Sequence, residues 1–301
     1  MIPVGNASLE RGRVVQSKLD DYKQQVADVY NRRSKTYGLN DWHPHLAEQL
    51  VHTANLKHGW RVLDVATGTG LAAFAAAAQV GSTGYVLGVD ISEEMLNVAR
   101  HQSQSVTNAP CEFRFADIES ADFPPESFDA ILCSSAIVWL ADIPAALAQW
   151  NRWLAPDGVV AFHAFSERSF VTGWVLQQVA PRHGVPLASF HGLTGSPKRC
   201  TDLLKTAGFG DISSHSEDRS SFLSEEEARN QYRNIITGPY PQSPTSGSPF
   251  GKLNDAQRSA LQADYEKELA KLVTAQGIWN ENITFYVFGR KTQTCSPLLN
   301  I

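Results

Sequence analysis

The sequence predicts an α/β protein in which helices cover both faces of a mostly parallel β-sheet. Between residues 59 and 165, apolar segments of strand length alternate with helical segments, and the first strand runs directly into a glycine turn, Gly68-Thr-Gly70, that opens a helix. Such alternation is typical of parallel strands joined by crossover helices. We expect strands at 60–66, 84–89, 112–115, 128–133 and 159–165, with helices at 71–80, 92–103 and 143–154.

The flanking segments predict cap helices and the remainder of the sheet. Their periodicity predicts helices at 20–37, 45–56, 170–180, 197–207, 224–236 and 254–272, a short strand near Ile212 and a last strand at 283–289. Ser224 and Glu227 form a capping-box pattern at the start of one of these helices. The stretch 238–251 contains four Pro, three Ser and three Gly, which predicts an irregular loop.

Composition and charge exclude several classes of function. The chain has 301 residues, 43% of them apolar, and its 31 acidic and 26 basic side chains give a net charge of -5 without a long run of either sign. This argues against nucleic acid as a partner. The longest apolar stretches, 71–80 and 130–140, are shorter than the roughly 20 residues that span a bilayer. With no recognisable signal peptide, we expect a cytoplasmic protein that acts on a small molecule; the sequence is compatible with a homodimer.

The four cysteines are far apart and form no pattern suited to a metal site, so we expect no metal.

The glycine turn and an acidic residue indicate an adenosine-containing ligand. Gly68 and Gly70 allow backbone N–H groups to approach a ligand closely, and Asp90 ends the second strand twenty residues later, where its carboxylate can accept hydrogen bonds from ribose hydroxyls. A branched side chain at either glycine is expected to block binding and to spare the fold. Nicotinamide dehydrogenases and methyltransferases both fit this pattern.

Two residues favour a methyltransferase over a dehydrogenase. Ala73 stands where a dinucleotide-binding turn usually has a third glycine, which a pyrophosphate requires. Asp64 lies inside the first strand, where an acidic group suits a cationic amino acid moiety better than a pyrophosphate.

At this point the chain resembles the class I methyltransferases, which use S-adenosylmethionine. The segment Asp64-Val-Ala-Thr-Gly-Thr-Gly70 is similar to the first motif of their quinone-biosynthesis (UbiE-like) branch, with Ala66 where the general motif has glycine. Gly88-Val-Asp-Ile-Ser92 and Phe115-Ala-Asp-Ile118 resemble the second and third motifs. The resemblance implies a Rossmann-like sheet of seven strands, the last one antiparallel, with N-terminal and C-terminal lid helices.

The resemblance also implies a division of the chain and a set of cofactor-binding residues. We expect a single domain, 1–301, with cap helices at 15–58, a cofactor-binding core at 59–165, substrate lid insertions at 166–196 and 222–280, and the end of the sheet at 197–221 and 281–291. The expected cofactor-binding residues are Tyr37, Asp64, Ala66, Thr67, Gly68, Gly70, Asp90, Ile91, Met95, Ala116, Asp117, Ile118 and Ser134.

The catalytic and substrate-binding residues follow less directly from the sequence. A hydroxyl or acidic carbon acceptor needs a base, for which His163, His43 and His45 are the candidates, although a buried histidine is more often structural. Trp139 and Trp174 are expected to contact a small apolar or aromatic acceptor, bound under an aromatic-rich lid. The alternatives are a nicotinamide-dependent oxidoreductase and a cofactor-binding protein of this fold that does not transfer methyl.

Overall fold

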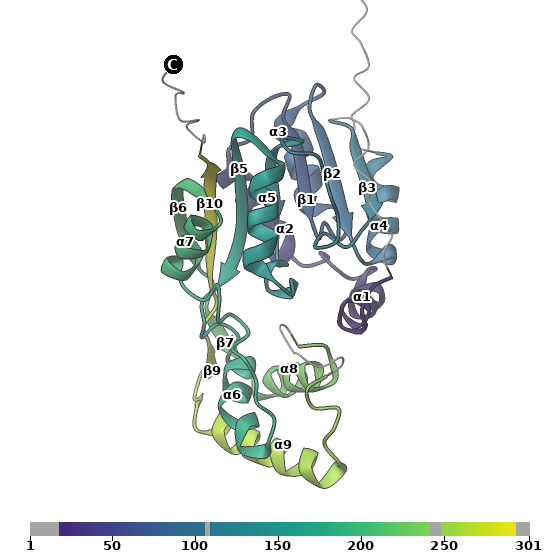
Figure 1. Ribbon diagram of the computed structural model, residues 1–301. Coiled ribbons are helices and arrows are strands. Elements are labelled where there is room, and N and C mark those ends of the chain that lie inside the picture. Colours follow the sequence, from purple (N-terminus) through teal and green to yellow (C-terminus); the bar gives the residue numbers. More distant parts are fainter. Residues whose placement is uncertain (1–17, 106–108, 241–247, 293–301) are drawn as a thin grey trace, which may run out of the picture.

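The central element of the computed structural model is a seven-stranded sheet with the strand order β3-β2-β1-β4-β5-β10-β6 (Figure 1). The structure describes residues 18–105, 109–240 and 248–292. Strands β1 to β5 run parallel, whereas β10 is antiparallel to both of its neighbours, β5 and β6. The strands of this sheet are β1 (Arg61–Val65), β2 (Tyr85–Asp90), β3 (Cys111–Phe115), β4 (Phe128–Cys133), β5 (Leu154–Phe165), β6 (Phe209–Asp218) and β10 (Ile283–Lys291).

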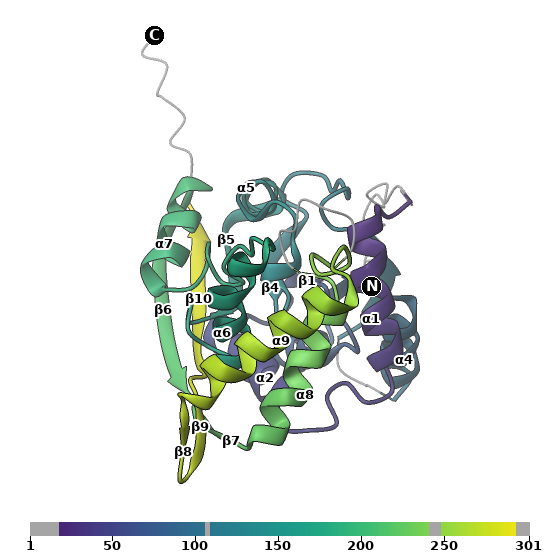
Figure 2. The same cartoon turned by 90° about the horizontal axis from the view of Figure 1, so that it is seen from below.

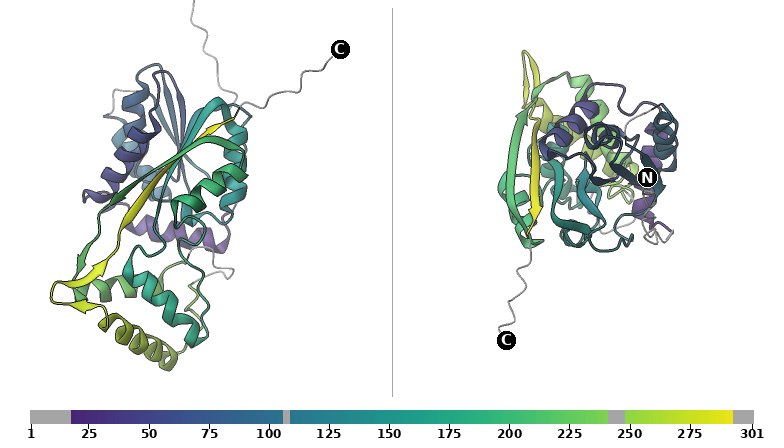
Figure 3. Two further views of the ribbon diagram at one scale, coloured as in Figure 1. Left: turned by 90° about the vertical axis from the view of Figure 1, so that its left-hand side faces the viewer. Right: turned by 90° about the horizontal axis from the view of Figure 1, so that it is seen from above.

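Helices cover both faces of this sheet, as the sequence predicts. Successive strand residues point to opposite faces, so Val62 packs with one helical layer and Leu63 with the other. One layer contains α2 (Trp42–Ala54), α3 (Leu71–Val80) and α4 (Glu93–Ser103), and the other contains α5 (Ile143–Trp153) and α7 (Pro197–Thr206). Each layer packs on the sheet through one apolar cluster. Because β1 to β5 are parallel, their carboxyl ends lie along one edge of the sheet (Figure 3).

A separate helical cluster lies beyond those carboxyl ends (Figures 1 and 2). We call it the lid. Its apolar core combines α6 (Val171–Val179), α8 (Glu225–Thr237) and α9 (Asp255–Ala270), which come from two distant parts of the chain. A small sheet, β7 (Ser221–Leu223), β9 (Gly277–Asn280) and β8 (Val273–Thr274), connects the lid to β6 and β10. The predicted capping box of α8 is present at Ser224 and Glu227.

The first helix, α1 (Asp21–Arg33), crosses the same edge of the sheet and lies beside α4. It ends four residues before Tyr37, so the prediction of a helix over 20–37 was too long. The reason is a turn at 34–38 that ends at Gly38, which has a φ of +78°. Helix α2 begins at Trp42, three residues earlier than predicted.

Other differences from prediction concern the strands. Strand β6 has ten residues instead of a short segment near Ile212, because it pairs with β10 along almost its whole length. Strand β5 begins at Leu154, which pairs with Phe128, rather than at Val159. The sequence did not predict the three-stranded sheet. Part of the predicted irregular loop, 241–247, lies outside the described residues. No helix of the described chain is long and apolar enough to cross a membrane.

Candidate cofactor site

A cavity opens between α1 and the carboxyl ends of β1, β2 and β4. Its volume is about 780 Å³, with the open mouth included. A second, smaller cavity of about 300 Å³ adjoins it at the glycine turn. Residues of the predicted cofactor set that line the first cavity are Tyr37, Ala66, Gly68, Asp90, Ile91, Met95, Ala116, Asp117, Ile118 and Ser134. Those that line the second cavity are Tyr37, Asp64, Ala66, Thr67, Gly68 and Ser134.

Asp90 stands at the end of β2 with its carboxylate held from behind by the backbone. Its Oδ2 accepts a hydrogen bond from the Gly68 N–H at 2.8 Å, and its Oδ1 accepts one from the Ser92 N–H at 2.8 Å. Each carboxylate oxygen keeps a lone pair that can accept from a ligand hydroxyl. Burial raises the pKa of Asp90 to about 6, so the carboxylate is largely ionised at neutral pH. This arrangement suits the two hydroxyls of a ribose.

The glycine turn contains one residue that faces the cavity and one that does not. A Cβ on Gly68 would meet only the Tyr37 ring, at 3.9 Å, so this position borders open space. A Cβ on Gly70 would lie 2.7 Å from Phe74 and 3.2 Å from Phe113, and Gly70 lines neither cavity. The structure therefore places Gly70 away from both cavities and against two aromatic rings, which favours a packing role for this glycine.

Ala66 adopts the backbone conformation that the general motif assigns to glycine. Its φ is +52°, in the left-handed region that costs roughly 1–2 kcal/mol for a residue with a Cβ. The departure from the motif noted in the sequence therefore keeps the turn geometry, at the expense of local strain.

The second cavity contains an unpaired carboxylate oxygen. Asp64 is 1% exposed, and its Oδ2 accepts a hydrogen bond from the Thr67 hydroxyl at 2.6 Å. Its Oδ1 has no partner among the described residues. Burial raises the pKa of Asp64 to about 7. A buried carboxylate without a partner is costly unless a cation or a donor meets it, so this cavity suits an ammonium group.

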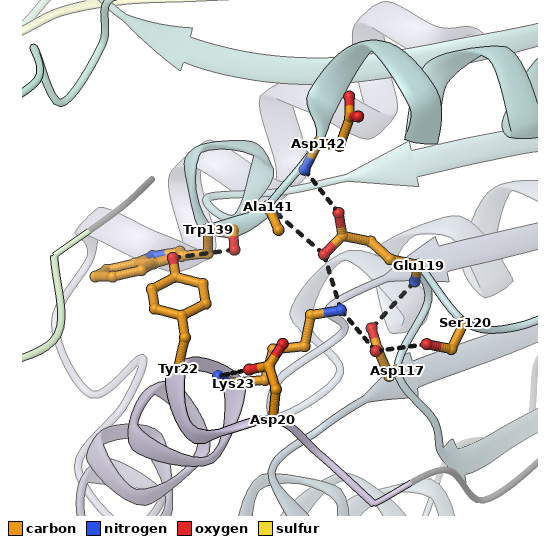
Figure 4. A network of polar contacts seen from close by, with 9 residues as sticks. All are labelled: Asp20, Tyr22, Lys23, Asp117, Glu119, Ser120, Trp139, Ala141 and Asp142. Carbon is orange, nitrogen blue, oxygen red and sulfur yellow. Dashed lines mark hydrogen bonds and ion pairs between the residues drawn. The ribbon is translucent and has the colours of Figure 1, made fainter. Parts of the chain in front are cut away.

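The opposite end of the larger cavity is closed by a charged network on α1 (Figure 4). The Lys23 ammonium donates to Asp117 Oδ2 at 2.6 Å and lies 3.1 Å from Glu119 Oε2. Burial lowers the pKa of Lys23, but its hydrogen bonds and ion pairs with these two carboxylates outweigh burial and raise the pKa overall. Lys23 therefore remains charged and joins α1 to the loop after β3.

The same network extends to the loop between β4 and α5. Glu119 accepts hydrogen bonds from the backbone N–H groups of Ala141, at 3.1 Å, and Asp142, at 2.9 Å. The Tyr22 hydroxyl donates to the Trp139 carbonyl at 3.2 Å (Figure 4). Helix α1 is therefore fastened to two different loops across the mouth of the cavity. Lys23 and Glu119 belong to no glycine or acidic motif, so the sequence did not predict either residue at this site.

The three histidine candidates occupy different environments. His43 lines the second cavity, and its ring lies tilted against the Tyr37 ring with 4.2 Å between centroids. Burial, together with the nearby Arg33 charge, lowers the pKa of His43 to about 4. His163 is 1% exposed and lines neither cavity. His45 lies outside both cavities, with its Nε2 2.8 Å from Glu217. The structure thus brings only His43 to the site.

The two tryptophan candidates also separate. Trp139 lines the larger cavity, and its ring meets Tyr30 edge-on at 6.2 Å between centroids. Trp174 packs against the lid core beneath Arg168 and lines neither cavity. In the part of the chain that the structure describes, no group of three or more His, Cys, Asp or Glu side chains could hold a metal ion.

The comparisons with known proteins agree with this geometry. A family model described as a methyltransferase domain matches residues 62–158. A 2-phytyl-1,4-naphtoquinone methyltransferase of Nostoc punctiforme is 32% identical over 177 residues, 56% of this chain and 77% of the relative. The aklanonic acid methyltransferase DauC of a Streptomyces species is 34% identical over 144 residues, 47% of this chain and 65% of the relative. The chain thus spans somewhat less than two thirds of DauC.

Solved structures show the same fold. The YcgJ protein of Bacillus subtilis superposes with a TM-score of 0.56 at 18% identity, covering 83% of this chain and 100% of that chain. The [4+2]-cyclase SpnF superposes with a TM-score of 0.54 at 18% identity, covering 90% of this chain and 97% of that chain. At such identities the likeness concerns the fold alone.

The chain therefore belongs to the class I S-adenosylmethionine-dependent methyltransferases. S-adenosylmethionine is its cofactor, and the predicted seven-stranded fold with an antiparallel last strand is confirmed. The comparisons give no support to a nicotinamide-dependent oxidoreductase.

Proposed function

We propose that the protein transfers the methyl group of S-adenosylmethionine to an oxygen, nitrogen or carbon nucleophile of a small apolar or aromatic metabolite in a biosynthetic pathway. The observation that carries this proposal is the unpaired Oδ1 of Asp64, buried in a cavity next to the glycine turn and within one site with Asp90. An ammonium and a ribose placed on these two carboxylates are the two polar ends that this cofactor presents.

The cofactor assignments follow the geometry of the two cavities. In this proposal Asp90 accepts from the ribose hydroxyls, Asp64 meets the ammonium, and the adenine lies between Ile91 and Met95 with its amino group directed to Asp117. Met95 is fully buried and so offers the ring a fixed apolar surface.

The acceptor class is supported by aromatic side chains between the core and the lid. Trp139 meets Phe190 edge-on with 5.7 Å between centroids, and Phe190 meets Tyr240 in the same way at 5.3 Å. This row connects the wall of the cofactor cavity to the lid. Flat apolar side chains in such a row suit an aromatic acceptor, in keeping with the naphthoquinone named for one relative.

The chemistry demands positioning more than reactive side chains. S-adenosylmethionine supplies an electrophilic methyl group on its sulfonium, so the protein has to hold the acceptor in line and exclude water. His43 is the histidine candidate that lines a cavity, and it is neutral at physiological pH because its pKa is low. In this proposal it is the group available to accept a proton from the acceptor.

The proposal is tested in two steps. Calorimetry with S-adenosylhomocysteine should show binding to the wild type and a loss of at least tenfold in Asp90→Ala, because two hydrogen bonds to a charged acceptor, each worth about 1.5–3 kcal/mol, disappear. Incubation of the protein with S-adenosylmethionine carrying a deuterated methyl group and a panel of phenols and quinols should then yield a product heavier by that group. Absence of S-adenosylhomocysteine binding would reject the site. Binding without transfer to any acceptor would favour a fold that retains the cofactor for another purpose.

A further inference from the structure

His163 lies next to Ser134 and Ser135, two residues that line both cavities. Its Nε2 accepts a hydrogen bond from the Ser135 backbone N–H at 2.7 Å and is 3.0 Å from the Ser135 hydroxyl. Ser135 lines both cavities, whereas His163, in the middle of the sheet on β5, lines neither. The imidazole therefore acts on the site through Ser135 and through Ser134, whose hydroxyl lies 3.4 Å from Nε2 and which also lines both cavities.

The contacts of His163 determine its protonation. Because Nε2 accepts from a backbone N–H, it carries no proton, and the ring proton resides on Nδ1. Nδ1 is buried without a hydrogen-bond partner among the described residues. Burial lowers the pKa of His163 to about 3, so the ring stays neutral. Its basic nitrogen is engaged by Ser135 and its side chain is 1% exposed, so the geometry favours a supporting role for His163 over the expected role of general base.

Ser135 needs such a restraint because its backbone is strained. Its φ is +59°, a conformation that residues with a Cβ rarely adopt and that surrounding contacts must maintain. The bond from Ser135 N–H to His163 is one such contact, and the Ser135 hydroxyl lies 3.0 Å from the same nitrogen.

The restraint reaches the ligand site through Tyr37. Tyr37 and Ser135 both line the two cavities, and the Ser135 side chain opposes the rise that burial causes in the pKa of Tyr37, whose phenol stays protonated. The Tyr37 ring is the nearest group to a Cβ placed on Gly68, and it lies tilted against the His43 ring. A contact chain thus runs from His163 through Ser135 to the ring that covers the second cavity.

We propose that His163 is a positioning residue for the amino acid end of the cofactor: its Nε2 holds Ser135 in the left-handed conformation, and Ser135 in turn holds Tyr37 over the second cavity. This inference rests on the proposed function, which places the ammonium of the cofactor in that cavity. In this scheme His163 contacts neither the cofactor nor the methyl acceptor. Its role is to accept a hydrogen bond from Ser135 at a fixed position.

The test compares two substitutions and two ligands by calorimetry. His163→Gln keeps an acceptor oxygen near the position of Nε2, whereas His163→Leu has none. S-adenosylhomocysteine has the amino acid end, and 5′-methylthioadenosine has the same adenosine without it. We expect His163→Leu to weaken S-adenosylhomocysteine binding at least tenfold and to change 5′-methylthioadenosine binding less than threefold. His163→Gln should bind both ligands within threefold of the wild type.

Each outcome has a separate meaning. Wild-type affinity for S-adenosylhomocysteine in His163→Leu, or an equal loss in His163→Gln, would overturn the positioning role and leave the proposed function standing. Failure of the wild type to bind S-adenosylhomocysteine would overturn both.

A second pair of variants is independent of the stability of His163→Leu. Ser135→Gly tolerates the positive φ and removes the hydroxymethyl side chain while keeping the backbone N–H, and Tyr37→Phe removes only the phenol oxygen. Both should lower the preference for S-adenosylhomocysteine over 5′-methylthioadenosine by at least threefold. Because the two groups act in series, the double variant should lose no more of this preference than the single variant with the larger loss. If the losses of the two single variants multiplied in the double variant, the two groups would act independently and the proposal would be overturned.

Discussion

The buried carboxylate of Asp64, which in our proposal binds the ammonium of the cofactor, also lowers the stability of the unliganded fold. The pKa of Asp64 is about 7 in the folded chain and near 3.9 in an unfolded one. A group whose pKa is raised by folding stabilises the protein while it is protonated, and this stabilisation is lost as the pH rises from about 4 through 7. At neutral pH the unliganded protein is therefore less stable than it would be with a neutral side chain at this position.

Asp64→Asn should separate these two effects. We expect the melting temperature of the unliganded variant to exceed that of the wild type by more at pH 8 than at pH 5, because only the wild type loses the protonated form. S-adenosylhomocysteine affinity should fall at least tenfold at pH 8. In the wild type this affinity should rise from pH 5 to 7 more steeply than in the variant, whose remaining slope comes from Asp90. Scanning calorimetry and titration calorimetry at the two pH values check the prediction; a variant less stable than the wild type at pH 8 would contradict it.

The two glycines of the turn permit a matched comparison. Gly68 has a φ of +55° and Gly70 a φ of +87°, so alanine at either position incurs similar backbone strain, roughly 1–2 kcal/mol. Only Gly70→Ala adds a steric conflict with Phe74 and Phe113. We expect Gly70→Ala to melt several degrees below Gly68→Ala, and Gly68→Ala to lose cofactor affinity while remaining folded. Circular dichroism and calorimetry decide, and equal melting temperatures would refute the packing role of Gly70.

At the scale of elements, α1 is the part of the site that the sequence predicted least well. The strands and helices of the core follow from local alternation, and the motif residues follow from turns that a few adjacent residues determine. Lys23 reaches Asp117 from 94 positions away, and Ser135 reaches His163 from 28 positions away, so no local pattern reveals either contact. The three- and four-residue spacing of apolar residues from Tyr22 to Tyr30 suggested one helix over 20–37, but the chain turns at 34–38 and ends that turn at Gly38.

The attachment of α1 predicts an effect on cofactor exchange. Replacing Lys23 by methionine keeps the length of the side chain and removes its ion pairs with Asp117 and Glu119. Because α1 covers the cavity, we expect S-adenosylhomocysteine to dissociate about tenfold faster, equivalent to roughly 1.4 kcal/mol. Arg32→Met, on the exposed side of the same helix, is the control. Stopped-flow dissociation measures the rates; slower dissociation from the Lys23 variant would mean instead that Lys23 competes with the adenine amino group for Asp117.

At the scale of the whole molecule, our proposal gives the lid and the core separate tasks. Every residue that lines the two cavities comes from residues 23–140, whereas Phe190 and Tyr240 belong to the lid side of the aromatic row. The sequence could not specify how α6 meets α8 and α9, because their shared core depends on contacts between distant segments.

This separation predicts that acceptor and cofactor constants respond independently. With an acceptor that turns over, Phe190→Leu should raise the acceptor KM at least fivefold, because it breaks the row between Trp139 and Tyr240. The affinity for S-adenosylhomocysteine should stay within twofold of the wild type. Phe222→Leu, at an aromatic residue on β7 that is 40% exposed, is the matched control for the loss of a ring. Equal effects of the two substitutions on KM would remove the row from the acceptor site.

The position of β10 has a consequence for the order in which the protein forms during synthesis. This strand lies between β5 and β6 although both precede it in the chain. Until Ile283–Lys291 has left the ribosome, β5 and β6 lack the strand that lies between them. Each then presents an open edge to which another chain can add. The cavity-lining residues, 23–140, and His163 behind them all precede β6 and β10 in the chain, so this half can acquire structure while these edges remain open. The nascent protein can therefore hold its cofactor before it has a finished sheet, and a bound cofactor would stabilise the emerging half during that interval.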